Sequence, residues 1–202
     1  MASTGLMEFG HIRRMTDTRF PYEVAVILPG EYFVSQEPKV VYTVLGSCIS
    51  VCLRDPLAGV GGMNHFMLAA PANTDGHDNW TDSGRYGSFA MEMLMNDIFK
   101  RGGRKERLEA KVFGGGKIYD GTIDIGAKNA AWALDFLAQE EILLVKADVG
   151  DACPRKVYYF TDSGKVLLKK LDRVVASEIV QEEGQYRAKL QQAPVQSEVT
   201  LF

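Results

Sequence analysis

The chain has 202 residues, of which 46% are hydrophobic and 24% are charged, and its 23 basic and 26 acidic residues give a formal net charge of −3. This is the composition of a globular protein. A chain of this length buries about 70% of its unfolded surface and needs no disulfides or metal ions to stabilise its fold. The weakly negative charge argues against a general nucleic-acid-binding protein, which needs a basic surface. The three cysteines are an odd number and cannot form a closed disulfide framework.

Hydropathy predicts neither a membrane span nor a secretory signal. The best apolar candidate, residues 40–53, is interrupted by Thr43, Ser47 and Ser50 and is shorter than the roughly 18 residues that a membrane helix needs. The first twenty residues are rich in charge and lack an apolar signal core. We therefore expect a cytoplasmic protein with reduced thiols and no membrane insertion.

In chain order, we expect an irregular lead-in over residues 1–22, a single domain over 23–172 and a polar tail over 173–202 with room for one peripheral helix. Alternation and β-branched composition predict the strands, which are residues 23–28, 32–35, 40–45, 48–54, 60–68, 108–112, 142–149, 157–160 and 166–171. A loop is expected over residues 69–84. One helix follows it and ends at Gly102-Gly103, and a second covers residues 127–139. This order of elements predicts an α+β fold.

The segment around Cys48 and His65 carries the clearest chemical signal. The residues Asp55-Pro56-Leu57-Ala58-Gly59 have the composition of a turn, so the strands on either side should form an antiparallel hairpin. With an even number of loop residues, Cys48 and His65 lie on the same face, either directly opposite or one diagonal step apart. A bulge at Gly61-Gly62 would change this register.

A thiol beside an imidazole is the arrangement that nucleophilic catalysis needs, because the imidazole can take the thiol proton. Gly46 and Ser47 allow a sharp turn before the cysteine, whose amide N–H groups can face a developing oxyanion. The hydroxyl of Thr43, on the preceding strand, can orient the imidazole. The structural alternative is that Cys48 is a small core residue and His65 a satisfied structural one, since cysteine is among the most buried residue types.

The segment Gly114-Gly115-Gly116-Lys117 lacks the remaining residues of a phosphate-binding loop, because position 111 is Lys and position 118 is Ile. We interpret it as a tight strand exit beside the site, so that Gly114 and Gly115 join Gly46 and Ser47 as residues expected to position the oxyanion or the substrate. Cys52 is expected to be a packing residue.

Ordered motifs follow one another between about residues 30 and 170. They are Gly46-Ser47-Cys48-Ile49-Ser50-Val51-Cys52-Leu53, Asp55-Pro56, Gly61-Gly62-Met63-Asn64-His65-Phe66-Met67-Leu68, Arg85-Tyr86-Gly87, Ala110-Lys111-Val112-Phe113-Gly114-Gly115, Ile125-Gly126 with Asn129, and Asp148-Val149-Gly150 with Arg155. Together they resemble the chemoreceptor glutamine deamidase family CheD. Where that family usually has a pair of glycines after the aspartate, this chain has Gly150-Asp151.

The resemblance implies hydrolysis of glutamine side chains on methyl-accepting chemotaxis receptors to glutamate and ammonia. It maps the catalytic residues of the family onto Cys48, His65 and Thr43, with no metal and no cofactor. It also implies a layered α/β/β sandwich of mixed sheets with two main helices outside, similar to the deamidating cytotoxic necrotizing factor toxins. The implied partners are the cytoplasmic domains of the receptors and, for some members, a CheC-like phosphatase.

Three other functions remain open from the residues alone. A non-catalytic module that binds a chemotaxis phosphatase or receptor would not need the intact set of Cys48, His65 and Thr43. A redox-sensing cysteine protein is disfavoured by the lack of a Cys-x-x-Cys pair. A cysteine protease could use the same thiol and imidazole, but the resemblance favours side-chain amides.

Overall fold

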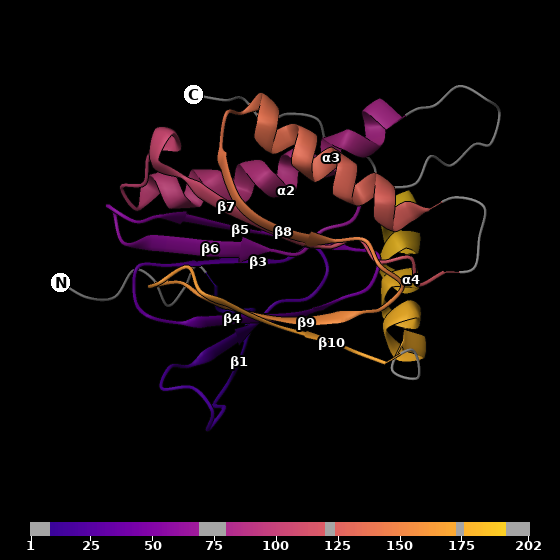
Figure 1. Ribbon diagram of the computed structural model, residues 1–202, viewed down its shortest axis with the longest axis horizontal. Coiled ribbons are helices and arrows are strands. Elements are labelled where there is room, and N and C mark those ends of the chain that lie inside the picture. The colour runs from indigo at the N-terminus through magenta and orange to yellow at the C-terminus, as the bar shows by residue number, and fades with distance from the viewer. Residues whose placement is uncertain (1–8, 69–79, 120–123, 173–175, 193–202) are drawn as a thin grey trace.

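The computed structural model describes residues 9–68, 80–119, 124–172 and 176–192, and shows two five-stranded sheets stacked face to face (Figure 1). The first sheet has the order β1-β2-β4-β9-β10. Its strands are β1 (Arg13–Met15), β2 (Val24–Val26), β4 (Val40–Leu45), β9 (Arg155–Phe160) and β10 (Val166–Lys170). All neighbours in this sheet are antiparallel except β2 and β4, which are parallel.

The second sheet has the order β3-β6-β5-β7-β8. Its strands are β3 (Tyr32–Ser35), β5 (Ile49–Asp55), β6 (Val60–Asn64), β7 (Glu109–Gly114) and β8 (Leu143–Val149). Only β7 and β8 are parallel. Both sheets are therefore mixed, and the chain passes from the first to the second between β4 and β5.

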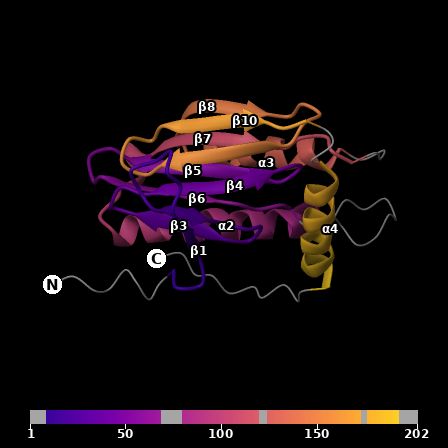
Figure 2. The ribbon, with the colours of Figure 1, turned by 90° about the horizontal axis from the view of Figure 1, so that it is seen from below.

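Two helices cover the outer face of the second sheet. They are α2 (Trp80–Lys100), which packs on β3, β5 and β6, and α3 (Ile125–Gln139), which packs on β5, β7 and β8 (Figure 1). A short 3₁₀ turn, η1 (Lys105–Arg107), precedes β7. The third helix, α4 (Ala176–Gln192), stands across one end of the sandwich (Figures 1 and 2). This arrangement confirms the expected layered α+β fold with two main helices outside.

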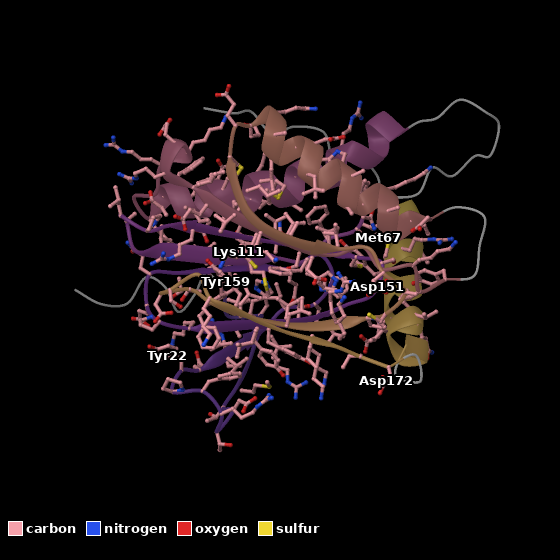
Figure 3. The ribbon with its side chains drawn as sticks, viewed as in Figure 1. Tyr22, Met67, Lys111, Asp151, Tyr159 and Asp172 are labelled. Carbon is pink, nitrogen blue, oxygen red and sulfur yellow. The ribbon has the colours of Figure 1, made fainter. Side chains whose placement is uncertain are left out.

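The central strand β5 lies between the helices and the first sheet. Its residues are buried on both faces apart from Arg54, and this explains its nearly continuous apolar sequence, since a strand covered on both sides has no polar face. The two sheets are also joined by hydrogen bonds. The Tyr159 hydroxyl donates to the Leu53 carbonyl at 2.9 Å, and the Lys111 ammonium donates to the Gly164 carbonyl at 2.6 Å (Figure 3).

The turn after β5 has the expected chemistry. One oxygen of the Asp55 carboxylate accepts hydrogen bonds from the amides of Leu57 and Ala58, and the other accepts from the Arg107 side chain. These bonds hold the pKa of the Asp55 carboxyl below its ordinary value against the opposing effect of burial. The turn aligns β5 with β6 so that Cys52 pairs with Met63, and the pairing extends to a bridge between Ile49 and Phe66.

At the two ends of the chain, the structure adds detail to the expected lead-in and to the expected tail, which left room for one helix. The expected lead-in contains β1, which pairs with β2. It is only three residues long and half-exposed at the sheet edge, so it needs no apolar alternation. In the expected tail, α4 is an integral element, because it buries Ile179 and Glu183. Residues 1–8, 69–79 and 193–202, which include most of the expected loop, lie outside the described residues. No helix in the described parts of the chain is both long and apolar enough to cross a membrane.

Candidate active site

The residues Gly46, Ser47 and Cys48 connect β4 of the first sheet to β5 of the second. They follow β4 and precede β5, and all three are buried. A Cβ atom on Gly46 would overlap the terminal methyl group of Ile118 and approach the Glu183 carboxylate to 3.0 Å. A larger residue at position 46 would therefore displace the Ile118 side chain and crowd the Glu183 carboxylate. We call residues 46–48 the crossing loop.

The carbonyl groups of the crossing loop all point away from the site, because each accepts a hydrogen bond from behind. Gly116 N–H donates to the Gly46 carbonyl at 2.7 Å, and Gly115 N–H donates to the Cys48 carbonyl at 2.8 Å. The Asn129 side-chain amide, from α3, donates to the Ser47 carbonyl at 2.8 Å. With the carbonyl groups held in this way, the N–H groups of the loop are directed to the other side.

These bonds define the place of the expected residues Gly114 and Gly115. Both have positive φ angles, 115° and 65°, and a Cβ on Gly114 would overlap the Cys48 carbonyl. The Gly115 N–H is already bonded to Cys48, and the Gly114 carbonyl accepts from the Arg155 guanidinium. Gly115 therefore supports the crossing loop through its N–H group, and the expected role of Gly114 and Gly115 in positioning an oxyanion or a substrate stays a prediction.

Cys48 and His65 lie one diagonal step apart on the same face of the β5-β6 pair. Continuing the register of the pair places Met67 opposite Cys48, so His65 is two residues away from the direct partner. Both residues lie just beyond the ends of their strands. The thiol of Cys48, a ring nitrogen of His65 and a carboxylate oxygen of Glu183 lie within 4.8 Å of one another. The diagonal alternative of the predicted register is thus the one in the structure.

Thr43 determines which nitrogen of His65 carries the proton. Its hydroxyl lies 2.8 Å from the Ile27 carbonyl and 2.8 Å from Nδ1 of His65. A carbonyl oxygen can only accept, so the single Thr43 proton is donated to Ile27, and Nδ1 must donate its own proton to the Thr43 oxygen. The lone pair of the neutral ring is then on Nε2, which has no hydrogen-bond partner among the described residues. This is the tautomer that a general base requires.

Burial keeps both reactive groups neutral in this structure. It raises the pKa of the Cys48 thiol well above its ordinary value, and the neighbouring Glu183 carboxylate raises it further. Burial lowers the pKa of His65 to about 3, although the Ile27 carbonyl acts in the opposite direction. Cys48 is 0% exposed and His65 is 2% exposed. The site as it stands is therefore closed to bulk solvent.

The carboxylate of Glu183, on α4, fills the space in front of the crossing loop. Its Oε1 atom accepts from Gly46 N–H at 2.8 Å and from Cys48 N–H at 3.2 Å. Its Oε2 atom accepts from Ser47 N–H at 2.9 Å and from the Ser47 hydroxyl at 2.6 Å. Four donors thus converge on one anion, and three of them are successive backbone amides, as in an oxyanion hole.

A thiol, an imidazole and a carboxylate are also a possible ligand set for a transition metal. Here, however, the carboxylate oxygens are committed to the four donors of the crossing loop. Backbone N–H groups carry positive partial charge and oppose a cation at the same point. The electrostatics of the site favour an anion or a developing oxyanion over a metal ion.

Comparison with known proteins identifies the family. Residues 67–170 match the family model described as CheD chemotactic sensory transduction. A protein of Dechloromonas aromatica named probable chemoreceptor glutamine deamidase CheD 1 is 47% identical over 191 residues, which are 94% of each chain. The chain belongs to the CheD family.

Other CheD proteins match over most of their length as well. Proteins named probable chemoreceptor glutamine deamidase CheD are 46% identical in Methylobacillus flagellatus, covering 92% of this chain and 93% of theirs, and 44% identical in Hydrogenovibrio crunogenus, covering 87% and 92%. Among solved structures, the Bacillus licheniformis hypothetical protein YfiH aligns with 58% of this chain and 49% of its own at 12% identity and a TM-score of 0.38.

Two polar residues that belong to the motifs of the CheD resemblance, Asn129 and Arg155, hold the backbone around the site by hydrogen bonds. Asn129 accepts from Leu68 N–H at 3.0 Å while it donates to the crossing loop. Arg155 is fully buried, and its guanidinium donates to the carbonyl groups of Gly114, Asp148 and Gly150. Among the other thiols of this CheD chain, Cys52 is a buried core residue, as expected, and Cys153 is half-buried.

Sequence reasoning did not find Glu183. Residues 173–202 were interpreted as a polar tail, and an acidic residue in a polar helix usually lies on a solvated face. One signal was available in the CheD sequence. Ile179, Tyr186 and Leu190 are spaced as one face of a helix, and Glu183 lies in the middle of that face.

Proposed function

We propose that this CheD protein is a protein-glutamine deamidase that hydrolyses glutamine side chains of methyl-accepting chemotaxis receptors to glutamate and ammonia. One observation supports this best. The three amide N–H groups of the crossing loop, the Cys48 thiol and the His65 imidazole converge on a single side-chain carboxylate. A side-chain carboxylate is the product of amide hydrolysis, and its place is within reach of a nucleophile and a base.

The reaction begins with the thiol of Cys48. Nε2 of His65 takes the thiol proton, and the sulfur attacks the carbon of the glutamine carboxamide. The negative charge that develops on the amide oxygen is stabilised by the N–H groups of Gly46 and Cys48, which bond the Oε1 atom of Glu183 in the structure. The tetrahedral intermediate then collapses, the carbon–nitrogen bond breaks, and the His65 imidazolium donates its proton to the leaving ammonia.

Hydrolysis of the thioester completes the cycle. His65 is neutral again after ammonia leaves, and its Nε2 accepts a proton from a water molecule that attacks the thioester carbon. The carbon–sulfur bond breaks, glutamate is released, and Cys48 recovers its proton. Thr43 holds the imidazole in the tautomer that both steps need. Neither step requires a metal or an organic cofactor.

We also propose that the protein acts in the cytoplasm and that its partners are the receptors. Receptor glutamines that are modified lie in cytoplasmic domains, and three cysteines without a disulfide suit a reducing cytoplasm. Binding to a CheC-like phosphatase is a further proposal that rests on the family resemblance. The competing function is that of a non-catalytic module, which only binds a receptor or a phosphatase.

Mass spectrometry of a receptor cytoplasmic domain tests the activity. The domain is incubated with the wild-type protein and, side by side, with Cys48→Ala. We expect glutamine-to-glutamate conversion at particular positions with the wild type only. If neither protein converts several receptors, yet both are captured by a receptor or a CheC-like phosphatase in a pull-down, the chain is a binding module.

A further inference from the structure

Helix α4 closes the candidate active site. Cys48, His65 and Thr43 have 2% or less of their surface exposed, and the carboxylate in front of them belongs to the chain itself. A receptor glutamine cannot reach the crossing loop while Glu183 occupies it. The described structure is therefore a closed form, and an active form requires α4 to leave.

The contacts of α4 come from one face of the helix. Ile179 and Glu183 are buried, and Tyr186 and Leu190 pack against the main core. Outside this face, Glu182 and Gln185 are exposed. This face combines three apolar side chains with one carboxylate at the centre, and α4 stands across the end of both sheets rather than along a sheet face (Figure 2).

The body of the protein also holds the backbone of α4. The Tyr119 hydroxyl donates to the Val180 carbonyl at 3.2 Å, and the Tyr86 hydroxyl donates to the Leu190 carbonyl at 3.3 Å. The Tyr186 ring lies so close to Gly30 that a Cβ there would be 3.0 Å from its hydroxyl oxygen. Contacts to backbone carbonyl groups do not depend on side-chain identity, so the surface under α4 can hold another helix in the same place.

The four donors of the crossing loop distinguish a carboxylate from a carboxamide. Both oxygens of a carboxylate can accept the N–H groups of Gly46, Ser47 and Cys48. If a carboxamide places its oxygen at the position of Oε1, its NH₂ group faces the N–H of Ser47, and two donors then oppose each other. Glu183 is thus bound as the product of deamidation would be bound.

We propose that α4 is a built-in product analogue: it occupies the surface that binds a substrate helix, and Glu183 occupies the place of the newly formed glutamate. This inference rests on the proposed deamidase function. It assigns the substrate as a glutamine presented from an α-helix, with apolar side chains four residues before it and three and seven residues after it, as Ile179, Tyr186 and Leu190 flank Glu183. Release of α4 is the step that switches the enzyme on.

A chain with Glu183→Gln tests the geometry without any receptor, because the introduced glutamine is then a substrate of Cys48 in the same chain. The sulfur bonds to the carboxamide carbon of that glutamine, ammonia leaves with a proton from His65, and water hydrolyses the thioester to restore Glu183. We expect peptide mass spectrometry of the purified full chain to find glutamate at position 183. The exposed Gln181 and Gln185 stay glutamine and serve as internal controls. The double variant with Cys48→Ala should keep the introduced glutamine.

The second test measures the rate on a receptor domain. Glu183→Ala removes the carboxylate from the crossing loop. Glu182→Ala is the matched control, because it removes the same charge from the preceding residue, whose side chain is exposed. We expect Glu183→Ala to raise kcat/KM at least about tenfold, because it weakens only the closed form. Glu182→Ala should match the wild type. Tyr186→Ala, which removes an aromatic ring that packs α4 against the core, should also raise kcat/KM, and circular dichroism checks that each variant is folded.

The outcomes separate the two proposals. In one outcome, the wild type converts the receptor, Glu183→Ala and Tyr186→Ala leave that rate unchanged, and the Glu183→Gln chain shows no conversion at position 183. This outcome would overturn the role of α4 and keep the deamidase. Conversion at position 183 that depends on Cys48, with no receptor converted by any variant, would support α4 as a product analogue and remove the receptors as substrates. If neither position 183 nor any receptor is converted, both proposals are wrong.

Discussion

The buried imidazole of His65 predicts how the stability of the protein depends on pH. Burial lowers the pKa of His65 from 6.5 to about 3 in the folded protein, whereas the unfolded chain protonates this ring near its ordinary value. Below that value the unfolded state binds more protons than the folded state, so the free energy of unfolding falls as the pH falls. About two pH units below the ordinary value, the loss from this one ring is about 3 kcal/mol, at about 1.4 kcal/mol per unit.

Urea unfolding of the wild type and His65→Gln at neutral pH and near pH 4.5 measures this loss. A glutamine side chain at this position retains hydrogen-bonding groups near Thr43 but does not titrate. Asp17 and Asp151, whose carboxyl groups have pKa values of about 2, ionise below this window and are the same in both chains. The wild type should lose about 3 kcal/mol more than the variant over this range. Equal losses in the two proteins would refute a buried, neutral His65.

Three further predictions concern the residues around the crossing loop. Thr43→Val should lower kcat about 10- to 100-fold on a receptor domain, because the buried His65 Nδ1–H loses its oxygen acceptor at a cost of about 1–3 kcal/mol. Thr43→Ser should restore most of the rate. A Thr43→Val variant as fast as the wild type would exclude a positioning role for Thr43. Asn129→Leu should lower the free energy of unfolding by about 2–4 kcal/mol in urea, because Ser47 C=O and Leu68 N–H lose their partners, and a change below about 1 kcal/mol would contradict those two bonds. In the native protein, iodoacetamide should label the half-buried Cys153 before Cys48 and Cys52, which should react only in denaturant; peptide mapping that finds Cys48 labelled as fast as Cys153 would argue against a closed site.

Local patterns were enough to predict most strands, both outer helices and the α+β class, and the CheD resemblance supplied the layered sandwich. Alternation identified β7, strand-like composition identified β3, β4 and β6, and the Asp55 turn identified the connection between β5 and β6. The order of strands in the two sheets was not predictable in this way, because β4 pairs with β9 across more than one hundred residues of chain. Strand β1 was missed, since a three-residue edge strand needs little apolar patterning.

For the candidate site, the sequence predicted the residues that are close along the chain. Cys48 and His65 belong to one hairpin, so pairing rules placed them together, and Thr43 lies on the strand before them. Glu183 is 135 residues beyond Cys48, and no pairing rule connects it to the loop. Its helix is polar in composition, so only the packed structure reveals that its central acid is buried.

The bond between Thr43 and His65 joins the two halves of the sandwich. Thr43 is on β4 of the first sheet, and His65 follows β6 of the second. Cys48, the proposed nucleophile, lies at the end of the loop that connects β4 of the first sheet to β5 of the second. The alignment of the reactive atoms therefore depends on how the two sheets lie on each other. A core substitution that removes the Tyr159 bond to Leu53 is expected to weaken the contact between the two sheets, so activity should decline before the fold itself is lost.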